Sequence, residues 1–317
     1  MGKDITFLIN TSELTAGTRG ASLGPMALVT TARSVKSTFF GMHSVEVLPD
    51  WNHLLDHESN LCFAKYSDGL LNVFNALDEG ITPVLMKNHF PFILAGDHGS
   101  AGGTIATLKK NFPDKRLGVI WIDAHGDIHS PYTTPSGNMH GMPLATALNQ
   151  DNIKGNVNQL TEIEVNNWNA LKNIHGIAPK ISPEDLVFIG VRDLEEQEEE
   201  LINHLNIKNY TVDELRAAGP DAIAFEVIKK LEPCDAIYIS FDVDSMDPDH
   251  TSYGTGTPVK NGLFPKEIEC LISHFLKSEK VVCLEVVEVN PCLDNKKNKM
   301  AEIAFDLVVK FSQIITQ

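Results

Sequence analysis

A short apolar run, residues 117–122, ends abruptly in three strongly hydrated groups, Asp123, His125 and Asp127, and their position at the end of an apolar strand needs a physical reason. In an extended chain, residues i, i+2 and i+4 point to one face, roughly 6–7 Å apart along the strand. Because unpaired carboxylates are costly to bury, such groups are normally paired, hydrogen-bonded or bound to a metal. The pattern therefore predicts a buried strand whose carboxyl end carries a polar site.

Two further apolar runs end in the same way. FPFILAG leads into Asp97 and His98, and AIYISF leads into Asp242 and Asp244. One such acid can simply cap the next helix, but three strand ends of this kind in one chain are hard to attribute to chance. With Asp97 set aside, the strand ends offer four carboxylates and two imidazoles, namely His98, Asp123, His125, Asp127, Asp242 and Asp244.

This ligand set predicts a site for two metal ions. One divalent ion cannot use six such ligands and keep an open position, whereas two ions that share carboxylates can. A carboxylate-rich, thiol-free set suits Mn²⁺ and related ions better than structural zinc. Two metals about 3.5–4 Å apart can hold a bridging water and lower its pKa, which gives hydroxide near neutral pH.

Alternation of apolar runs with helical spacing predicts an α/β fold. Strands are expected at 5–9, 43–48, 90–98, 117–123, 186–193, 236–244 and 281–289. Helices are expected at 27–37, 58–77, 141–150, 265–277 and 298–314, with Gly80 placed to end the second. Because the strands are apolar throughout, we predict a single domain, residues 1–317, with a central parallel β-sheet flanked by helices on both faces. Ligands of such sheets bind at the carboxyl ends of the strands.

Composition excludes several classes of partner. The net charge of −16 argues against nucleic acid and is compatible with a cationic substrate, with bound divalent cations or with solubility alone. No apolar run approaches the ~20 residues that span a bilayer, so no membrane partner is expected. The cysteines are odd in number and scattered, at Cys62, Cys234, Cys270, Cys283 and Cys292, which predicts reduced core thiols and a cytoplasmic protein.

Several segments resemble the successive motifs of the ureohydrolase family. They are GDHGSAGGT, DAHGDIHSPYTTPSGNMHGMP, SFDVDSMDP, TGTPVKNGL and EVNP, spread over residues 96–291, with RGASLGP near the N-terminus. The SGNMHGMP segment is similar to the arginase branch of the family, whereas agmatinases differ on both sides of the His-Gly pair. The resemblance implies an arginase-like three-layer α/β/α fold and a homo-oligomer, either a trimer or a hexamer.

The resemblance also implies the reaction and the ligands of each ion. One Mn²⁺ would be held by His98, Asp123, Asp127 and Asp242, and the other by His125, Asp123, Asp242 and Asp244, with Co²⁺ as a possible replacement. A hydroxide bridging the ions would attack the guanidinium carbon of L-arginine, and the products would be L-ornithine and urea.

Three residues are candidates for catalysis. Glu288, at the end of the last strand, can accept guanidinium N–H donors in a forked pair, although a structural ion pair is the other interpretation. Asp127 can accept a hydrogen bond from the hydroxide and so orient it. His140 can protonate the departing amine because imidazole titrates near the working pH, although a loop histidine can also be purely structural.

The resemblance places the amino-acid end of the substrate against other residues. Ser136 and Asn138 match residues that hold the α-carboxylate, and Thr257 matches a threonine near the guanidinium. His129 and Glu195 depart from the family pattern, which has Asn and Asp there. Arg192 and Asp193 match a segment expected to support the wall of the site.

Other functions remain open at this stage. Another guanidino hydrolase, of the agmatinase, guanidinobutyrase or formiminoglutamase type, is the nearest alternative, and the Ser136–Asn138 pair argues for a substrate with a carboxylate. A deacetylase-like amidohydrolase with one zinc conflicts with the six-ligand set. A non-catalytic metal- or arginine-binding regulator conflicts with the filled catalytic positions.

Overall fold

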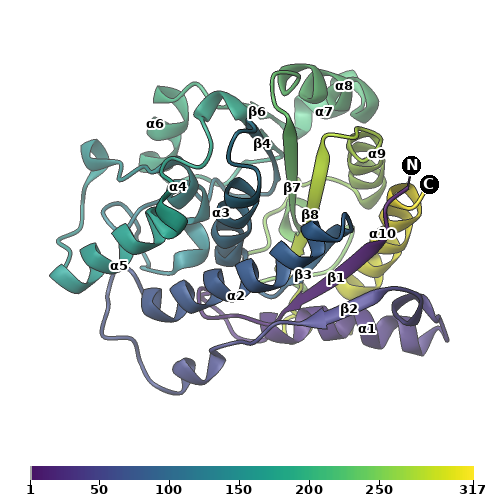
Figure 1. The fold of residues 1–317 in the computed structure, drawn as a ribbon, viewed down its shortest axis with the longest axis horizontal. Helices are drawn as coiled ribbons and strands as arrows, with labels where there is room; N and C mark the ends of the chain where they lie inside the picture. The colour runs from purple at the N-terminus through teal and green to yellow at the C-terminus, as the bar shows by residue number, and fades with distance from the viewer. Residues whose placement is uncertain (1) are drawn as a thin grey trace.

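In the computed structural model, which describes residues 2–317, the strands form one parallel eight-stranded sheet (Figure 1). Their bounds are β1 Ile5–Asn10, β2 Ser44–Val47, β3 Phe90–Ala95, β4 Leu117–Ile122, β5 Leu186–Ile189, β6 Lys208–Tyr210, β7 Ala236–Asp242 and β8 Val281–Val287. Their order across the sheet is β2-β1-β3-β8-β7-β4-β5-β6. The predicted fold class is therefore confirmed.

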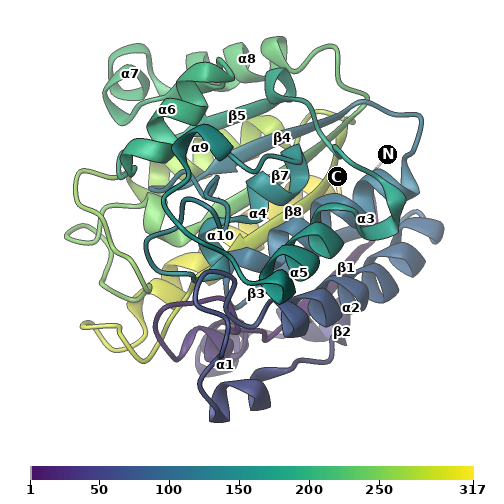
Figure 2. The same cartoon turned by 90° about the vertical axis from the view of Figure 1, so that its left-hand side faces the viewer.

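Helices cover both faces of this sheet. One face packs against α1 (Gly24–Ser34), α7 (Val212–Ala218), α8 (Pro220–Lys230), α9 (Pro265–Phe275) and α10 (Lys299–Ile315). The other face packs against α2 (Ser67–Met86), α3 (Ala101–Asn111), α4 (Pro143–Leu148), α5 (Glu162–Lys172) and α6 (Glu196–His204). Figure 2 shows α2 and α5 side by side on this second face. The strands are apolar throughout because alternate residues enter opposite cores; Ile120 lies in one and Trp121 in the other.

The strand order brings distant motifs together. The chain passes from β3 to β4 and returns much later to insert β8 and β7 between them. The carboxyl ends of β3, β8, β7 and β4 are therefore consecutive along one edge of the sheet, where α/β folds bind their ligands.

The helix predicted at 58–77 is wrong at both ends, because α2 spans Ser67–Met86. Gly80 does not end this helix. It lies inside it, buried, where a β-carbon would come within 2.5 Å of the Leu48 Cδ2 atom. Helical spacing alone could not distinguish a terminating glycine from one selected for close packing. The short strand β6 was also missed, because it is polar and lies at the sheet edge.

The cysteine prediction is only partly right. Cys234 and Cys283 are buried, but Cys62 and Cys292 are exposed and so are not core residues. Among the described residues, no helix combines the length and the apolar character needed to cross a membrane.

The glycine pair of the GDHGSAGGT motif has a packing role that can be tested. A β-carbon on Gly103 would lie 2.9 Å from the Phe74 Cα atom, at the crossing of α2 and α3. We expect Gly103→Ala to destabilise the protein by about 1–3 kcal/mol, although alanine is the better helix former. Denaturant unfolding measures this. Gly41→Ala, where a β-carbon meets nothing within 4 Å, is the control, and an unchanged stability of Gly103→Ala would contradict the packing role.

Candidate metal centre

Metal-type side chains gather at the ends of three adjacent or near-adjacent strands. His98 follows β3, Asp123 follows β4, Asp242 is the last residue of β7 and Asp244 lies in the turn after it. All four are at most 2 % exposed. The sheet thus brings together residues that are far apart in the sequence.

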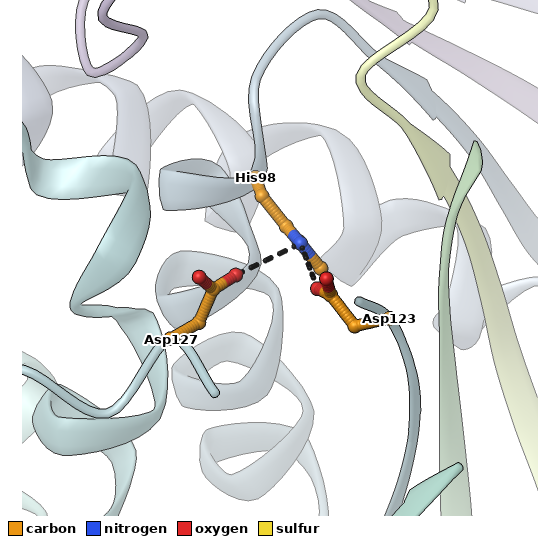
Figure 3. Close-up of side chains that lie close together, drawn as sticks. All are labelled: His98, Asp123 and Asp127. Carbon is orange, nitrogen blue, oxygen red and sulfur yellow. Dashed lines mark ion pairs between the residues drawn. The ribbon is translucent and has the colours of Figure 1, made fainter. Parts of the chain in front are cut away.

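The first cluster surrounds the Nδ1 atom of His98. This atom lies 2.9 Å from Asp123 Oδ2, 3.1 Å from Asp127 Oδ2 and 3.2 Å from Asp242 Oδ2. Figure 3 shows the side chains of Asp123 and Asp127 pointing at the His98 ring. Nδ1 of His98 and Oδ2 of Asp123 are buried without a hydrogen-bond partner, because these contacts lack hydrogen-bond geometry. Ligand atoms that point at one another without forming hydrogen bonds are the arrangement expected around a bound cation.

The His98 ring is held so that Nδ1 faces the carboxylates. Its Nε2 atom lies 2.7 Å from Ser240 Oγ, and the Trp121 ring stacks on it at 4.0 Å between centroids. A partner on the second ring nitrogen fixes the orientation of a metal-binding histidine and raises its basicity.

The second cluster surrounds His125. Its Nδ1 atom lies 3.1 Å from Asp244 Oδ2 and 3.4 Å from Asp123 Oδ1. Asp123 therefore offers one oxygen to each cluster, as a bridging ligand does. Asp242 turns Oδ2 to the first cluster, while its Oδ1 accepts a hydrogen bond from the Asp244 N–H at 2.7 Å. All six predicted ligand residues lie in these two clusters.

The charges of the clusters are unbalanced without a cation. Burial and the neighbouring Asp123 carboxylate raise the pKa of Asp127 to about 6. Burial and the facing acids also raise the pKa values of Asp242 and Asp244. Crowded buried carboxylates take up protons when no cation compensates them. The donor set thus fits a pair of divalent ions that prefer oxygen and imidazole ligands.

Two residues of the centre have strained backbones. Asp127 has φ 47° and Glu288 has φ 67°, in the left-handed region that L-residues rarely adopt. Each costs about 1–3 kcal/mol and persists only where surrounding contacts enforce it. The Asp127 carbonyl accepts from Leu144 N, and the Glu288 N–H donates to the Gly96 carbonyl. Such strain commonly marks functional sites.

A cavity of about 290 Å³ opens onto both clusters. Its lining includes the predicted residues His129, Ser136, Asn138, His140, Glu195, Thr257 and Glu288. Glu288 Oε1 accepts from the His98 backbone N–H at 2.9 Å and lies 3.7 Å from His140 Nδ1. Burial lowers the pKa of His140, but the nearby Glu288 carboxylate, together with Asp127 and Asp97, raises it, and the overall shift is upward. Thr257 donates to Asp244 Oδ2 at 3.1 Å.

A third cluster, which we call the His129 group, consists of His129, Glu195 and Glu198. The Nε2 atom of His129 lies 3.2 Å from Glu195 Oε2 and 3.5 Å from Glu198 Oε2, and its Nδ1 atom lies 3.0 Å from Thr133 Oγ1. The hydrogen bond to His129 lowers the pKa of Glu195 to about 2, whereas burial raises that of Glu198. Both ring nitrogens of His129 are thus engaged.

Sequence reasoning missed Glu198 and the role of Asp97. Glu198 is 3 % exposed and accepts from the Ile128 and Glu195 N–H groups. In the sequence it is one of several acids in a run that indicates only a solvated helix face. Asp97 accepts from the Thr15 N–H at 2.7 Å and so holds the loop whose residues 16–18 line the cavity.

Arg192 supports the cavity wall through the backbone. Its guanidinium donates to the carbonyl groups of Gly190, Asp244, Val259 and Lys260. One side chain therefore ties the turn after β7 to the loop that carries Thr257, as expected for a wall-supporting segment.

Comparisons with known proteins agree with this geometry. The family model described as "Arginase family" matches residues 4–312. The chain is 34 % identical to the arginase of Bacillus subtilis (strain 168) over 308 residues, which is 97 % of each chain. It is 34 % identical to the arginase of Bacillus caldovelox over 293 residues, covering 92 % of this chain and 91 % of that protein.

Solved structures give the same result. The crystal structure of the Bacillus caldovelox arginase matches with a TM-score of 0.81 at 32 % identity, covering 98 % of each chain. The Helicobacter pylori arginase matches with a TM-score of 0.80 at 26 % identity, covering 99 % of this chain and 100 % of that one. A Bacillus subtilis formimidoylglutamase shares the fold, with a TM-score of 0.74 at 18 % identity. The match covers 100 % of this chain and 88 % of the formimidoylglutamase. The chain belongs to the arginase family of ureohydrolases.

Proposed function

We propose that the protein hydrolyses the guanidinium group of L-arginine to L-ornithine and urea, with two Mn²⁺ ions per chain, which Co²⁺ can replace. The observation that carries this proposal is the pair of buried clusters that share Asp123 and lie beside Glu288 in one cavity. When bound, the two ions supply Lewis acidity and lower the pKa of a shared water, which provides the nucleophile.

The residues of the chain orient the reaction. The Glu288 carboxylate accepts the N–H donors of the guanidinium in a charge-assisted pair, and the His98 N–H that it also binds fixes its position. Asp127 accepts a hydrogen bond from the nucleophile and aims it at the guanidinium carbon. His140 protonates the departing nitrogen as the C–N bond breaks, and the nearby Glu288 carboxylate raises its pKa, which favours the protonated form that this role needs.

The amino-acid end of the substrate contacts two sets of residues, one for its α-carboxylate and one for its α-ammonium. Ser136 and Asn138 bind the α-carboxylate, and Glu195 with Glu198 binds the α-ammonium. His129 contributes little to the carboxylate, because Thr133 and Glu195 already occupy its ring nitrogens. We propose that it positions Glu195 instead.

This arrangement also favours a second candidate, another guanidino hydrolase of the agmatinase, guanidinobutyrase or formiminoglutamase type. The engaged His129 removes one donor to a substrate carboxylate, and the cavity lining is rich in acids. A substrate without a carboxylate, such as agmatine, would gain from both features.

We further propose a single domain over residues 1–317, because one continuous sheet joins both ends of the chain. A homo-oligomer, trimeric or hexameric, rests on the family resemblance. A cytoplasmic location rests on the cysteines, which are scattered and odd in number.

Steady-state urea release after Mn²⁺ or Co²⁺ loading tests the function. We expect L-arginine to have a kcat/KM at least about 100-fold above that of agmatine, guanidinobutyrate or formiminoglutamate, since each lacks a group that the site would pair: agmatine the α-carboxylate, guanidinobutyrate the α-ammonium and formiminoglutamate the guanidinium. A preference for agmatine would support the second candidate instead.

His140→Ala should separate proton transfer from metal binding. We expect kcat to fall about 10²–10⁴-fold, the usual contribution of a general acid, while metal content stays at that of the parent protein. Elemental analysis and urea release measure the two. Asp127→Ala serves as the contrast, because it removes a ligand and should lower both. Full activity of His140→Ala across pH would exclude the proton-transfer role.

Metal loading should stabilise the protein more at pH 8 than at pH 5.5. Protons compete with cations for a cluster in which the pKa of Asp127 is raised to about 6 and that of His98 is also raised. Affinity for the ions therefore rises as pH rises through these pKa values. Scanning calorimetry with and without a chelator measures the gain in Tm, and an equal gain at both pH values would argue against this site.

A further inference from the structure

The cavity lining poses an electrostatic problem for an α-carboxylate. Among the described residues that line it, seven are Asp or Glu and none is Lys or Arg, the acids being Asp127, Asp193, Glu195, Glu198, Asp242, Asp244 and Glu288. The divalent ions offset the acids of the metal clusters, but not those of the His129 group. A positive charge near this cavity would therefore favour the binding of a substrate carboxylate.

The ammonium group of Lys65 lies just outside the cavity and is hydrogen-bonded to a residue that lines it. The Nζ atom of Lys65 donates to Asn138 Oδ1 at 3.4 Å, and Asn138 lines the cavity. Within residues 2–317, Lys65 forms no ion pair, so no neighbouring acid neutralises its charge. Lys65 lies in the loop before α2 and is half-buried.

This contact decides which end of the Asn138 amide faces the substrate. An ammonium can only donate, so it binds Oδ1 and leaves Nδ2, with its two N–H donors, on the opposite side. Nδ2 lies on the side of Gly17, another cavity residue, where a β-carbon would come within 2.8 Å of it. Asn138 therefore presents donors, which a carboxylate accepts.

The backbone of Lys65 is fixed at the cavity wall. Its N–H donates to the Gly137 carbonyl at 3.0 Å. Gly137 has φ 74°, and a β-carbon there would lie 1.9 Å from the Cys62 carbonyl oxygen, so the two segments are in direct backbone contact. Phe63 N–H donates to the buried Glu164 carboxylate at 2.7 Å. The segment 62–65 is thus attached on both sides.

We propose that Lys65 is a positioning residue for carboxylate recognition: it orients the Asn138 amide and supplies the positive charge that the cavity lining lacks. It thereby makes the site selective for guanidino compounds that carry an α-carboxylate. This inference rests on the proposed function, since it concerns the amino-acid end of the same substrate. His129, whose ring nitrogens are engaged elsewhere, leaves this task to Lys65 and Asn138.

The test compares Lys65→Met, which keeps the length of the side chain, with Lys65→Arg, which keeps a donor and the charge. We expect Lys65→Met to raise the KM for L-arginine about 10-fold with kcat within twofold, because charge and orientation act on binding. Lys65→Arg should recover most of the loss. Lys87→Met, at an exposed lysine that ends α2, is the control, and melting temperatures confirm folding.

A binding measurement separates this inference from the proposed function. Calorimetric titration of the Mn²⁺-loaded protein should show a Kd for L-ornithine about 10-fold higher in Lys65→Met, with the Kd for putrescine, which lacks the carboxylate, unchanged. An equal loss for both ligands, or no loss for L-ornithine, would overturn the role of Lys65. If the parent protein released no urea from L-arginine but Lys65→Met weakened only L-ornithine, the proposed function would fail and the inference would stand.

Discussion

The centre depends on four carboxylates that are buried where strand ends meet. Burying one carboxylate without a partner is costly, and burying four close together raises the pKa values of Asp127, Asp242 and Asp244. The imidazoles of His98 and His125 lie among them and lower the pKa of Asp123. The donor atoms therefore have no stable arrangement of full negative charge unless cations join them. The strained backbone of Asp127 and the orphaned Nδ1 atom of His98 are two signs of the same constraint.

The sheet order makes this concentration of charge possible. A chain whose strands were added in sequence would separate the ends of β3 and β7 by several strands. Insertion of β8 and β7 between β3 and β4 leaves only β8 between the ends of β3 and β7 and makes β7 a direct neighbour of β4. The apolar strands behind them, buried on both faces, keep water away and hold the ligands rigid. The same buried strands thus stabilise the sheet and fix the geometry of the site.

The strands other than β6, and the buried His and Asp groups at the strand ends, could be predicted from sequence because their signals are local. An apolar run that ends in Asp-x-His-x-Asp needs no knowledge of the rest of the fold. The start of α2 could not be predicted, because the residues at 58–66 share its spacing but contact the Gly137 loop instead. Glu198 and Lys65 were missed for a similar reason. Each is an ordinary charged residue in the sequence, and only its partner across the cavity gives it a role.

The site therefore has two parts with different physical origins. The metal end is built from strand termini, whose positions the sheet fixes, and its chemistry follows from burial. The recognition end that we propose is built from loops: Lys65 precedes α2, Asn138 follows β4 and Glu195 precedes α6. Loops can change residues without disturbing the sheet. His129 illustrates this in our proposal, because its ring turns to Glu195 while the ammonium of Lys65, from a different loop, contacts Asn138. A fixed reaction centre with an exchangeable recognition end allows one fold to act on different guanidino compounds.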